Sequence, residues 1–93
     1  PRVPAAPAGL AARALGPSAV ELTWRDLSDN EEEFRIEQKA GKTWRQVLVL
    51  PPGATSARLA GLRPDSTATY RVSARNAAGA APGPPVTVRT PRK

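Results

Sequence analysis

The chain of 93 residues has no cysteine, no histidine and no methionine, and its aromatic residues are two Trp, one Tyr and one Phe. Without cysteine there is no disulfide and no thiolate nucleophile. Without histidine as well, neither a Ser-His nor a Cys-His catalytic arrangement can form. Glycoside hydrolysis by two carboxylates would need a cleft between them, and the acidic residues gather mainly on one stretch. We therefore expect no enzyme and no cofactor.

Long apolar runs are also missing. No stretch approaches the ~20 apolar residues that a membrane-spanning helix needs, and no secretory signal pattern opens the chain. We expect no membrane insertion and interpret the sequence as a module of a longer protein. The isolated domain is expected to be monomeric.

Positive charge is in excess, with 14 Lys and Arg against 8 Asp and Glu, which gives a formal net charge of +6. Such a balance suits anionic glycans, acidic proteins or nucleic acid. The richness in Ala, Arg, Gly and Pro is equally typical of a GC-rich gene, in which case the charge serves no partner. Nucleic acid is disfavoured because bases stack on exposed aromatic rings. Only Trp44 is available, and it is expected to cap the edge of the fold.

Apolar and polar residues alternate in several short segments bounded by turn residues, which is typical of half-buried strands. The Pro-rich opening, residues 1–10, reads as a stiff linker running into a first edge strand, and 77–85 as a Gly/Ala/Pro-rich turn. The alternation predicts an all-β, seven-stranded antiparallel sandwich. The expected core consists of Val20, Leu22, Trp24, Phe34, Ile36, Val47, Leu59, Leu62, Tyr70, Val72, Ala74, Val86 and Val88.

The order of motifs resembles a fibronectin type III domain. The matching pieces are "VELTW" at 20–24, "FRI" at 34–36, "LAGLRP" at 59–64, "YRVSARN" at 70–76 and "VTVRT" at 86–90. Residues 24–37 are similar to a subtype common in multidomain extracellular proteins. The resemblance implies an immunoglobulin-like sandwich with sheets A-B-E and C-C′-F-G. We expect a linker over 1–6, the domain over 7–90 and a second linker over 91–93.

One position departs from the family pattern. The family usually carries a Tyr two residues before the aromatic of strand F, and its hydroxyl bonds back to the Gly-Leu-x-Pro turn. Here that position is Ala68. We expect the lost hydrogen bond to reduce stability by roughly 1 kcal/mol.

The acidic run 29–33 is the best catalytic or metal candidate by residue type, and it lies within the stretch "DLSDNEEE" at 26–33. It offers alternate oxygens at Asp26 and Ser28, but it lacks the Gly and the distant bidentate Glu of a calcium loop. We interpret it as a connector and expect no metal.

The outer face of the C-C′-F-G sheet is the candidate ligand surface. Alternation predicts that it carries Arg35, Lys39, Arg71, Arg75 and Arg89. Lys42 and Arg45 are expected nearby, and Arg45 is counted with these five as a candidate ligand residue of the basic face. This face suits a heparin-like glycan or an acidic protein; the alternative is a solvated face whose charges pair locally and discourage strand addition. Replacing Arg71 and Arg75 by Glu is expected to remove anionic-ligand binding without changing the melting temperature.

In a sandwich of seven antiparallel strands the first and last strands run in the same direction, so the chain should enter and leave at opposite ends. We therefore expect a non-catalytic spacer and protein-interaction module of the adhesion type, in contact with neighbouring domains and another protein. The alternatives are a dedicated anionic-ligand module and an appendage of a secreted carbohydrate-active enzyme. A secreted or cell-surface parent is expected, and an intracellular cytoskeletal or signalling protein is the alternative.

Overall fold

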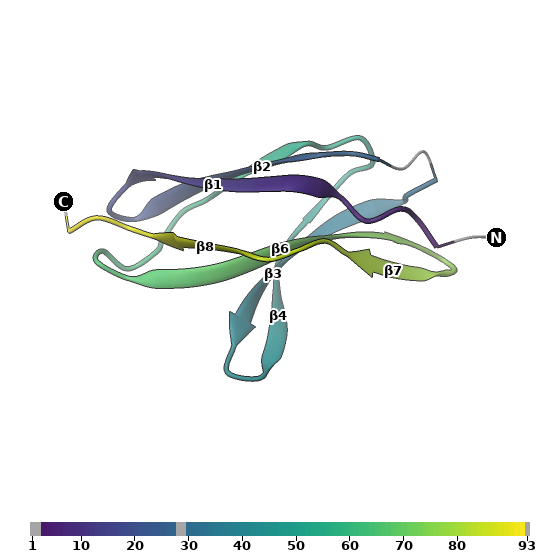
Figure 1. Ribbon diagram of the computed structural model, residues 1–93. Coiled ribbons are helices and arrows are strands. Elements are labelled where there is room, and N and C mark those ends of the chain that lie inside the picture. Colours follow the sequence, from purple (N-terminus) through teal and green to yellow (C-terminus); the bar gives the residue numbers. More distant parts are fainter. Residues whose placement is uncertain (1–2, 28–29, 93) are drawn as a thin grey trace.

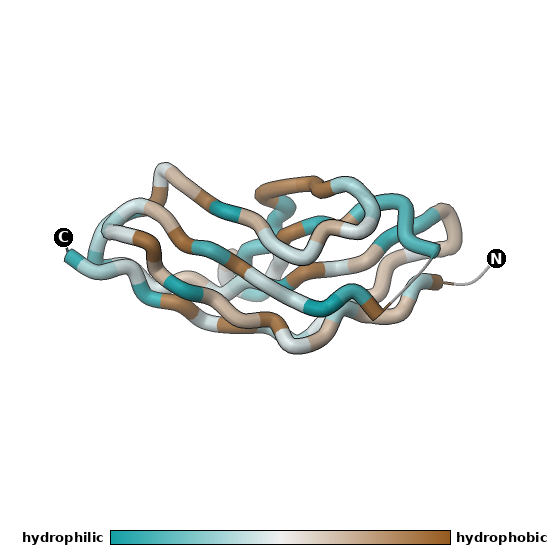
Figure 2. Tube along the Cα trace, turned by 90° about the horizontal axis from the view of Figure 1, so that it is seen from above, coloured by the Kyte–Doolittle hydropathy of each residue, from teal (hydrophilic) through white to brown (hydrophobic). Residues whose placement is uncertain are grey.

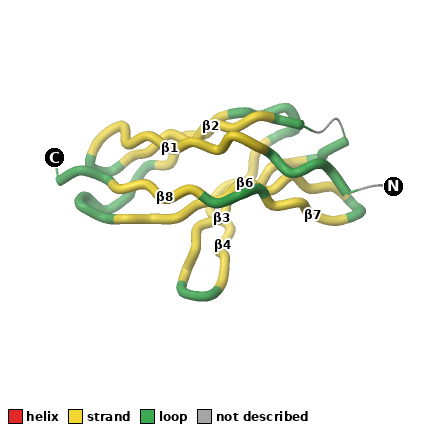
Figure 3. The backbone as a smooth tube through the Cα atoms, in the orientation of Figure 1, coloured by secondary structure: helices red, strands yellow, loops and turns green. Residues whose placement is uncertain are grey.

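The computed structural model describes residues 3–27 and 30–92 and consists of strands and connections (Figure 1, Figure 3). In that part of the chain no helix is long and apolar enough to cross a membrane. The strands are β1 (Ala8–Gly16), β2 (Ala19–Arg25), β3 (Glu33–Ala40), β4 (Thr43–Leu50), β5 (Ser56–Leu59), β6 (Thr67–Asn76), β7 (Gly79–Pro82) and β8 (Val86–Arg89).

Two antiparallel sheets form the predicted sandwich. The smaller sheet has the order β1-β2-β5, and the larger has the order β4-β3-β6-β7, with β8 also paired to β6. The predicted A-B-E and C-C′-F-G arrangement is confirmed. The count differs by one, because the last strand is divided: β7 pairs with one half of β6 and β8 with the other.

The expectation of a turn over residues 77–85 is therefore only partly right. Residues 79–82 form β7 instead, and the break between β7 and β8 falls at Gly83–Pro85. The strand survives its Pro82 because it lies at the edge of the sheet, where a missing N–H costs no ladder bond. The opening edge strand, which was predicted without an end, is β1 and runs to Gly16.

The core lies between the two sheets. Hydrophobic and hydrophilic residues alternate along much of the trace (Figure 2), as expected for strands with one buried face. Trp24 is 4% exposed, and its ring centroid lies 6.0 Å from that of Phe34. The other buried core residues are Val20, Leu22, Ile36, Ala57, Leu59, Tyr70, Val72 and Ala74, and Val47, Leu62, Val86 and Val88 are partly buried against them.

The hairpin of β3 and β4 projects from the sandwich (Figure 1). Its register shifts between Ile36 and Glu37, where β4 carries one extra residue. Because side chains alternate with a period of two, this bulge changes which residues of β4 face the core. Leu48 and Leu50 stand opposite Ile36 and Phe34 on the core side, whereas Trp44 lies on the outer face.

The N-terminal segment is held against the body of the domain. Pro4 and Pro7 are both buried, although residues 1–6 were expected to be a linker. The backbone of Gly83 passes close to Pro7: a Cβ at position 83 would lie 2.5 Å from the Pro7 carbonyl oxygen. The Gly83 N–H donates to the Val72 carbonyl at 2.9 Å. Glycine at 83 therefore allows the chain leaving β7 to pack directly on the chain entering β1.

The C-terminal end is held by Thr90, which is 3% exposed. Its hydroxyl donates to the Arg63 carbonyl at 2.6 Å and accepts from the Ser66 N–H at 3.1 Å. The Thr90 N–H donates to the Ser66 carbonyl at 2.8 Å. In the family a Tyr hydroxyl usually bonds to this turn, but position 68 is Ala in this chain. Thr90 supplies a hydroxyl to the turn instead.

We expect Thr90→Val to lower the free energy of unfolding by about 1–3 kcal/mol, because it keeps the shape but leaves buried backbone groups without their hydroxyl partner. Thermal denaturation followed by circular dichroism measures the loss. Thr87→Val is the control, since that hydroxyl bonds only to the exposed Thr69 hydroxyl at 2.9 Å. Equal melting temperatures for both variants would show that Thr90 does not hold the turn.

Candidate interaction surface

The outer face of the larger sheet carries most of the predicted ligand residues. The registers place Arg35 opposite Ser73, Glu37 opposite Arg71, and Arg89 opposite Thr67. Because directly opposed residues share a face, Arg35, Arg71 and Arg89 lie on one surface, and alternation adds Lys39 and Arg75. The structure therefore brings together five of the six predicted cations.

Arg71 lies at the centre of a network on this face. Its Nε donates to Glu37 Oε1 at 2.8 Å, and the Ser73 hydroxyl donates to the same oxygen at 3.1 Å. The guanidinium also lies 4.3 Å from the centre of the Trp44 ring, a cation–π contact. Trp44 therefore lies beneath Arg71 rather than capping the edge of the sandwich. The side chains of Arg71 and Glu37 are only 25% and 21% exposed.

This network changes the expected effect of the Arg71 and Arg75 substitutions. A Glu at position 71 would face the Glu37 carboxylate and would lose the contact with Trp44. Like charges directly opposed in a sheet are destabilising. The pair of substitutions would therefore alter the stability of the domain, and it cannot report on ligand binding alone as the sequence suggested.

Two further cations of this face are also neutralised. Arg35 forms an ion pair with Glu33. Arg89 donates to Asp65 at 2.5 Å, and Arg92 lies 3.4 Å from the same carboxylate. The hydrogen bond from Arg89 holds the pKa of the Asp65 carboxyl below its usual value. The same bond raises the pKa of the Arg89 guanidinium. Asp65 is itself in the left-handed region with φ of 51°, which short polar side chains tolerate.

Lys39 and Arg75 are also exposed on this face, and among the described residues neither lies within ion-pairing distance of a carboxylate. Arg45 does not belong to the face. It stands opposite Gln38, which stands opposite the buried Tyr70, so it faces the core side of the projecting hairpin. The prediction for Arg45 was wrong about its face. Trp44 stands opposite Lys39 on the outer face, and the next residue of a strand, here Arg45, points to the opposite face.

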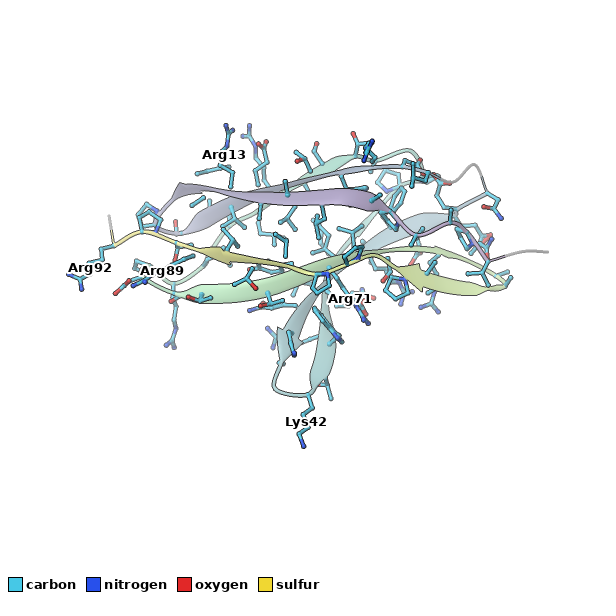
Figure 4. The ribbon with its side chains drawn as sticks, viewed as in Figure 1. Arg13, Lys42, Arg71, Arg89 and Arg92 are labelled. Carbon is cyan, nitrogen blue, oxygen red and sulfur yellow. The ribbon has the colours of Figure 1, made fainter. Side chains whose placement is uncertain are left out.

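Positive charge is spread over the molecule (Figure 4). Arg13 stands on the outer side of the smaller sheet, Lys42 at the tip of the hairpin, and Arg89 and Arg92 at the C-terminal end. Glu21 lies within 3.2 Å of Arg13 and 3.6 Å of Arg58 on the smaller sheet. Over residues 3–27 and 30–92 the charge therefore does not concentrate into one strongly basic patch.

The acidic run joins the loops at one end of the sandwich. Glu31 accepts from the Gly53 N–H at 3.1 Å through Oε2, and the Asn76 amide donates to the Asn30 carbonyl at 3.2 Å. Ser28 and Asp29, which the calcium alternative also used, lie outside the described residues. In residues 3–27 and 30–92 no three metal-ligating side chains gather into a cluster. These contacts are those of a connector.

Sequence reasoning missed a cavity at the other end of the sandwich. It has a volume of about 150 Å³ and is lined by Val20, Leu62, Ala68, Tyr70 and Val88, among others. The only sequence signal was the small side chain at position 68, where the family has a large one.

Known proteins share this fold and sequence pattern. The family model for the fibronectin type III domain matches residues 5–89, and no curated protein matches the sequence. The FN3tt structure is 18% identical with a TM-score of 0.82, and the match covers 100% of both chains.

Two other similar structures are larger than this chain. The chicken CNTN1 FN1-FN3 domains are 22% identical, with a TM-score of 0.81 over 92% of this chain and 32% of that one. The twitchin kinase region from C. elegans is 23% identical, with a TM-score of 0.81 over 98% of this chain and 17% of that one. With the family model spanning both sheets, the chain belongs to the fibronectin type III domain family.

Proposed function

We propose that this domain is a spacer of a larger multidomain protein, which fixes the distance and the angle between its neighbours. The carrying observation is the position of the two ends. The chain enters at one end of the sandwich and leaves at the other (Figure 1), along a molecule that measures 46 × 25 × 19 Å. A domain with this arrangement adds its length to a chain of domains.

The attachment of both chain ends to the body of the domain supports a stiff spacer rather than a domain with flexible connections. Pro4 and Pro7 are buried on the N-terminal side, and Gly83 packs against the Pro7 carbonyl. On the C-terminal side Thr90 bonds to the turn after β5, and the Asp65 N–H donates to the Pro91 carbonyl at 3.0 Å. Because the backbone is held close to each exit, the orientation of one neighbour is transmitted to the other.

Fibronectin type III domains are generally non-catalytic modules, and the similar structures include multidomain proteins. We extend this to a non-catalytic role here, with neighbouring domains and a further protein as partners. A face whose Arg71, Arg35 and Arg89 are already paired offers an anionic glycan only Lys39 and Arg75. That distribution favours the spacer over the dedicated anionic-ligand module. The secreted or cell-surface parent, with its intracellular alternative, stays a prediction, as does the appendage of a carbohydrate-active enzyme.

Backbone ¹⁵N relaxation of the domain tests the attachment directly. We expect order parameters of about 0.85 for Ala5, Ala6 and Thr90, equal to those of the strands. Lys42, at the exposed hairpin tip, serves as the internal reference for greater mobility. Values under about 0.6 at Ala5, Ala6 and Thr90 would describe freely moving ends and would contradict a stiff spacer.

Gly83→Ala provides a matched variant for the same measurement, because its added methyl group would lie 2.5 Å from the Pro7 carbonyl oxygen, with the Val72 carbonyl oxygen next at 3.4 Å. The order parameters of Ala5 and Ala6 should fall, while that of Thr90 at the opposite end should not. If all three stay unchanged, the contact between Gly83 and Pro7 does not hold the N-terminal segment.

A further inference from the structure

Two hollows adjoin on the core side of the larger sheet, near the C-terminal end of the sandwich. The cavity of about 150 Å³ described above and a second hollow of about 210 Å³ share Gln38, Leu62 and Tyr70 among their lining residues. The second hollow also reaches Arg45 and Val47 of β4. Because the hairpin of β3 and β4 projects away from the smaller sheet (Figure 1), the core side of its far half is left uncovered. Together the two hollows form one open groove, here named the hairpin groove.

The register of the larger sheet gives the length of the hairpin groove. Arg45 stands opposite Gln38, and Gln38 stands opposite Tyr70. Two residues before Tyr70, Ala68 pairs with Val88 of β8. The hairpin groove thus crosses four neighbouring strands, and a spacing of about 4.8 Å between strands gives it a length of about 14 Å. An extended peptide of about four or five residues covers that length.

The floor of the hairpin groove is apolar, and its charged groups are all positive. Its hydrocarbon surface comes from Val20, Val47, Leu59, Leu62, Ala68 and Val88. Arg45 lines one hollow and Arg63 lines the other, and both are exposed. Among the described residues no Asp or Glu lines either hollow. Within residues 3–27 and 30–92 neither Arg forms an ion pair, in contrast to the paired cations of the outer face.

These walls suit an occupant that is both apolar and acidic. A purely apolar occupant would leave Arg45 and Arg63 without a carboxylate, and a purely anionic one would leave the apolar floor in contact with water. Exposed ion pairs contribute little individually, so the floor supplies most of the affinity and the two cations supply the preference for acid. Gln38, which lines both hollows, carries an amide that can donate to a peptide group and accept from one.

We propose that the hairpin groove binds an extended acidic segment of another protein, in which apolar side chains are flanked by carboxylates. The apolar side chains lie on the floor, and the carboxylates pair with Arg45 and Arg63. The proposal rests on the proposed function only for the existence of a further protein partner, to which it assigns a surface and a chemistry. A failure to bind would leave the spacer role intact, because the relaxation of the free domain tests that role separately.

Titration of the ¹³C-methyl-labelled domain with the capped pentapeptide Glu-Leu-Ala-Leu-Glu tests the proposal. We expect saturable shifts of the Val47, Leu62 and Val88 methyl signals. The control Gln-Leu-Ala-Leu-Gln lacks only the charges and should bind about threefold to tenfold more weakly. The control Glu-Ser-Ala-Ser-Glu keeps the charges but lacks the apolar side chains, and it should bind at least about tenfold more weakly. Equal affinity for either control, or no saturation at these methyls, would overturn the proposal.

One pair of variants locates the peptide. Ala60 is exposed and lines the hairpin groove, so Ala60→Glu places a carboxylate that repels the peptide and competes for Arg45. It should weaken binding of Glu-Leu-Ala-Leu-Glu by about twofold to fivefold. Ala80→Glu makes the same change of charge at an exposed position of β7, outside the hairpin groove, and should leave the affinity unchanged. Equal affinities of the two variants would place the peptide elsewhere and would reject the hairpin groove as its site.

Discussion

Trp24→Ala is expected to remove a large part of the domain's free energy of unfolding. The indole is 4% exposed between the sheets and packs against Phe34. Truncating a buried Trp or Phe to Ala costs about 3–5 kcal/mol, while small domains unfold with only about 5–15 kcal/mol. The second Trp, Trp44, lies on the outer face against Arg71. The chain has no cysteine, so no disulfide supports the core. Urea denaturation at 25 °C, followed by far-ultraviolet circular dichroism, gives the free energy of unfolding.

Trp44→Ala is the matched control, because it removes the same side chain from the outer face. Trp44 is half-buried and contacts Arg71, so its loss should cost only about 1 kcal/mol, mainly the cation–π contact. If Trp24→Ala melts cooperatively within a few degrees of the unsubstituted domain, the indole is not the main support of this core.

Gly83→Ala is expected to lower the free energy of unfolding by about 1–3 kcal/mol, as overpacked sites do. The added methyl group would lie 2.5 Å from the Pro7 carbonyl oxygen and 3.4 Å from that of Val72. Both neighbours are backbone, so neither can rotate away as a side chain would. For a domain of this size the melting temperature should fall by roughly 4–8 °C for each kcal/mol.

Gly16→Ala controls for the general effect of replacing a glycine in this fold. No atom lies within 4 Å of a Cβ at position 16, so the added methyl group meets open space. It should leave the melting temperature nearly unchanged or raise it slightly by restricting the unfolded chain. A Gly83→Ala domain as stable as Gly16→Ala would mean that the contact with Pro7 relaxes without cost.

Alternation was sufficient to predict the fold because the core-facing positions in the middle of β2, β3 and β6 are apolar, as at Leu22, Ile36 and Val72. The same signal fails where side chains are small. In β7, the sequence "GAAP" has no alternation, so a strand held by backbone pairing to β6 resembles a turn. The end of the opening strand, β1, could not be predicted for the same reason, because its second half is rich in Ala.

The candidate face could be predicted where the alternation continued unbroken, as for Arg71 and Arg75. It could not be predicted across the bulge of β4, since one extra residue reverses the faces on either side of it. Along this strand Val47 was predicted to be a core residue and Arg45 a surface residue. In a regular strand residues two positions apart lie on the same side, so both predictions could not hold without a bulge. The structure keeps Arg45 on the core side of the exposed hairpin end.

The cavity and the role of Thr90 depend on packing between distant segments. The sequence shows that Ala68 is small, but not whether the sheets collapse over it. Nor does it show that Thr90, just beyond the last strand, would be buried against the turn after β5. Both features result from contacts between residues twenty or more positions apart, which local patterns do not record.

The neighbouring positions of β1 and β8 have a mechanical consequence. These strands lie side by side and run in the same direction, with the N-terminus leading into one and the C-terminus leading out of the other (Figure 1). Tension applied to the two ends would pull them along their axes in opposite directions. The contacts between β1 and β8 would then be loaded in shear along both strands rather than peeled apart one at a time.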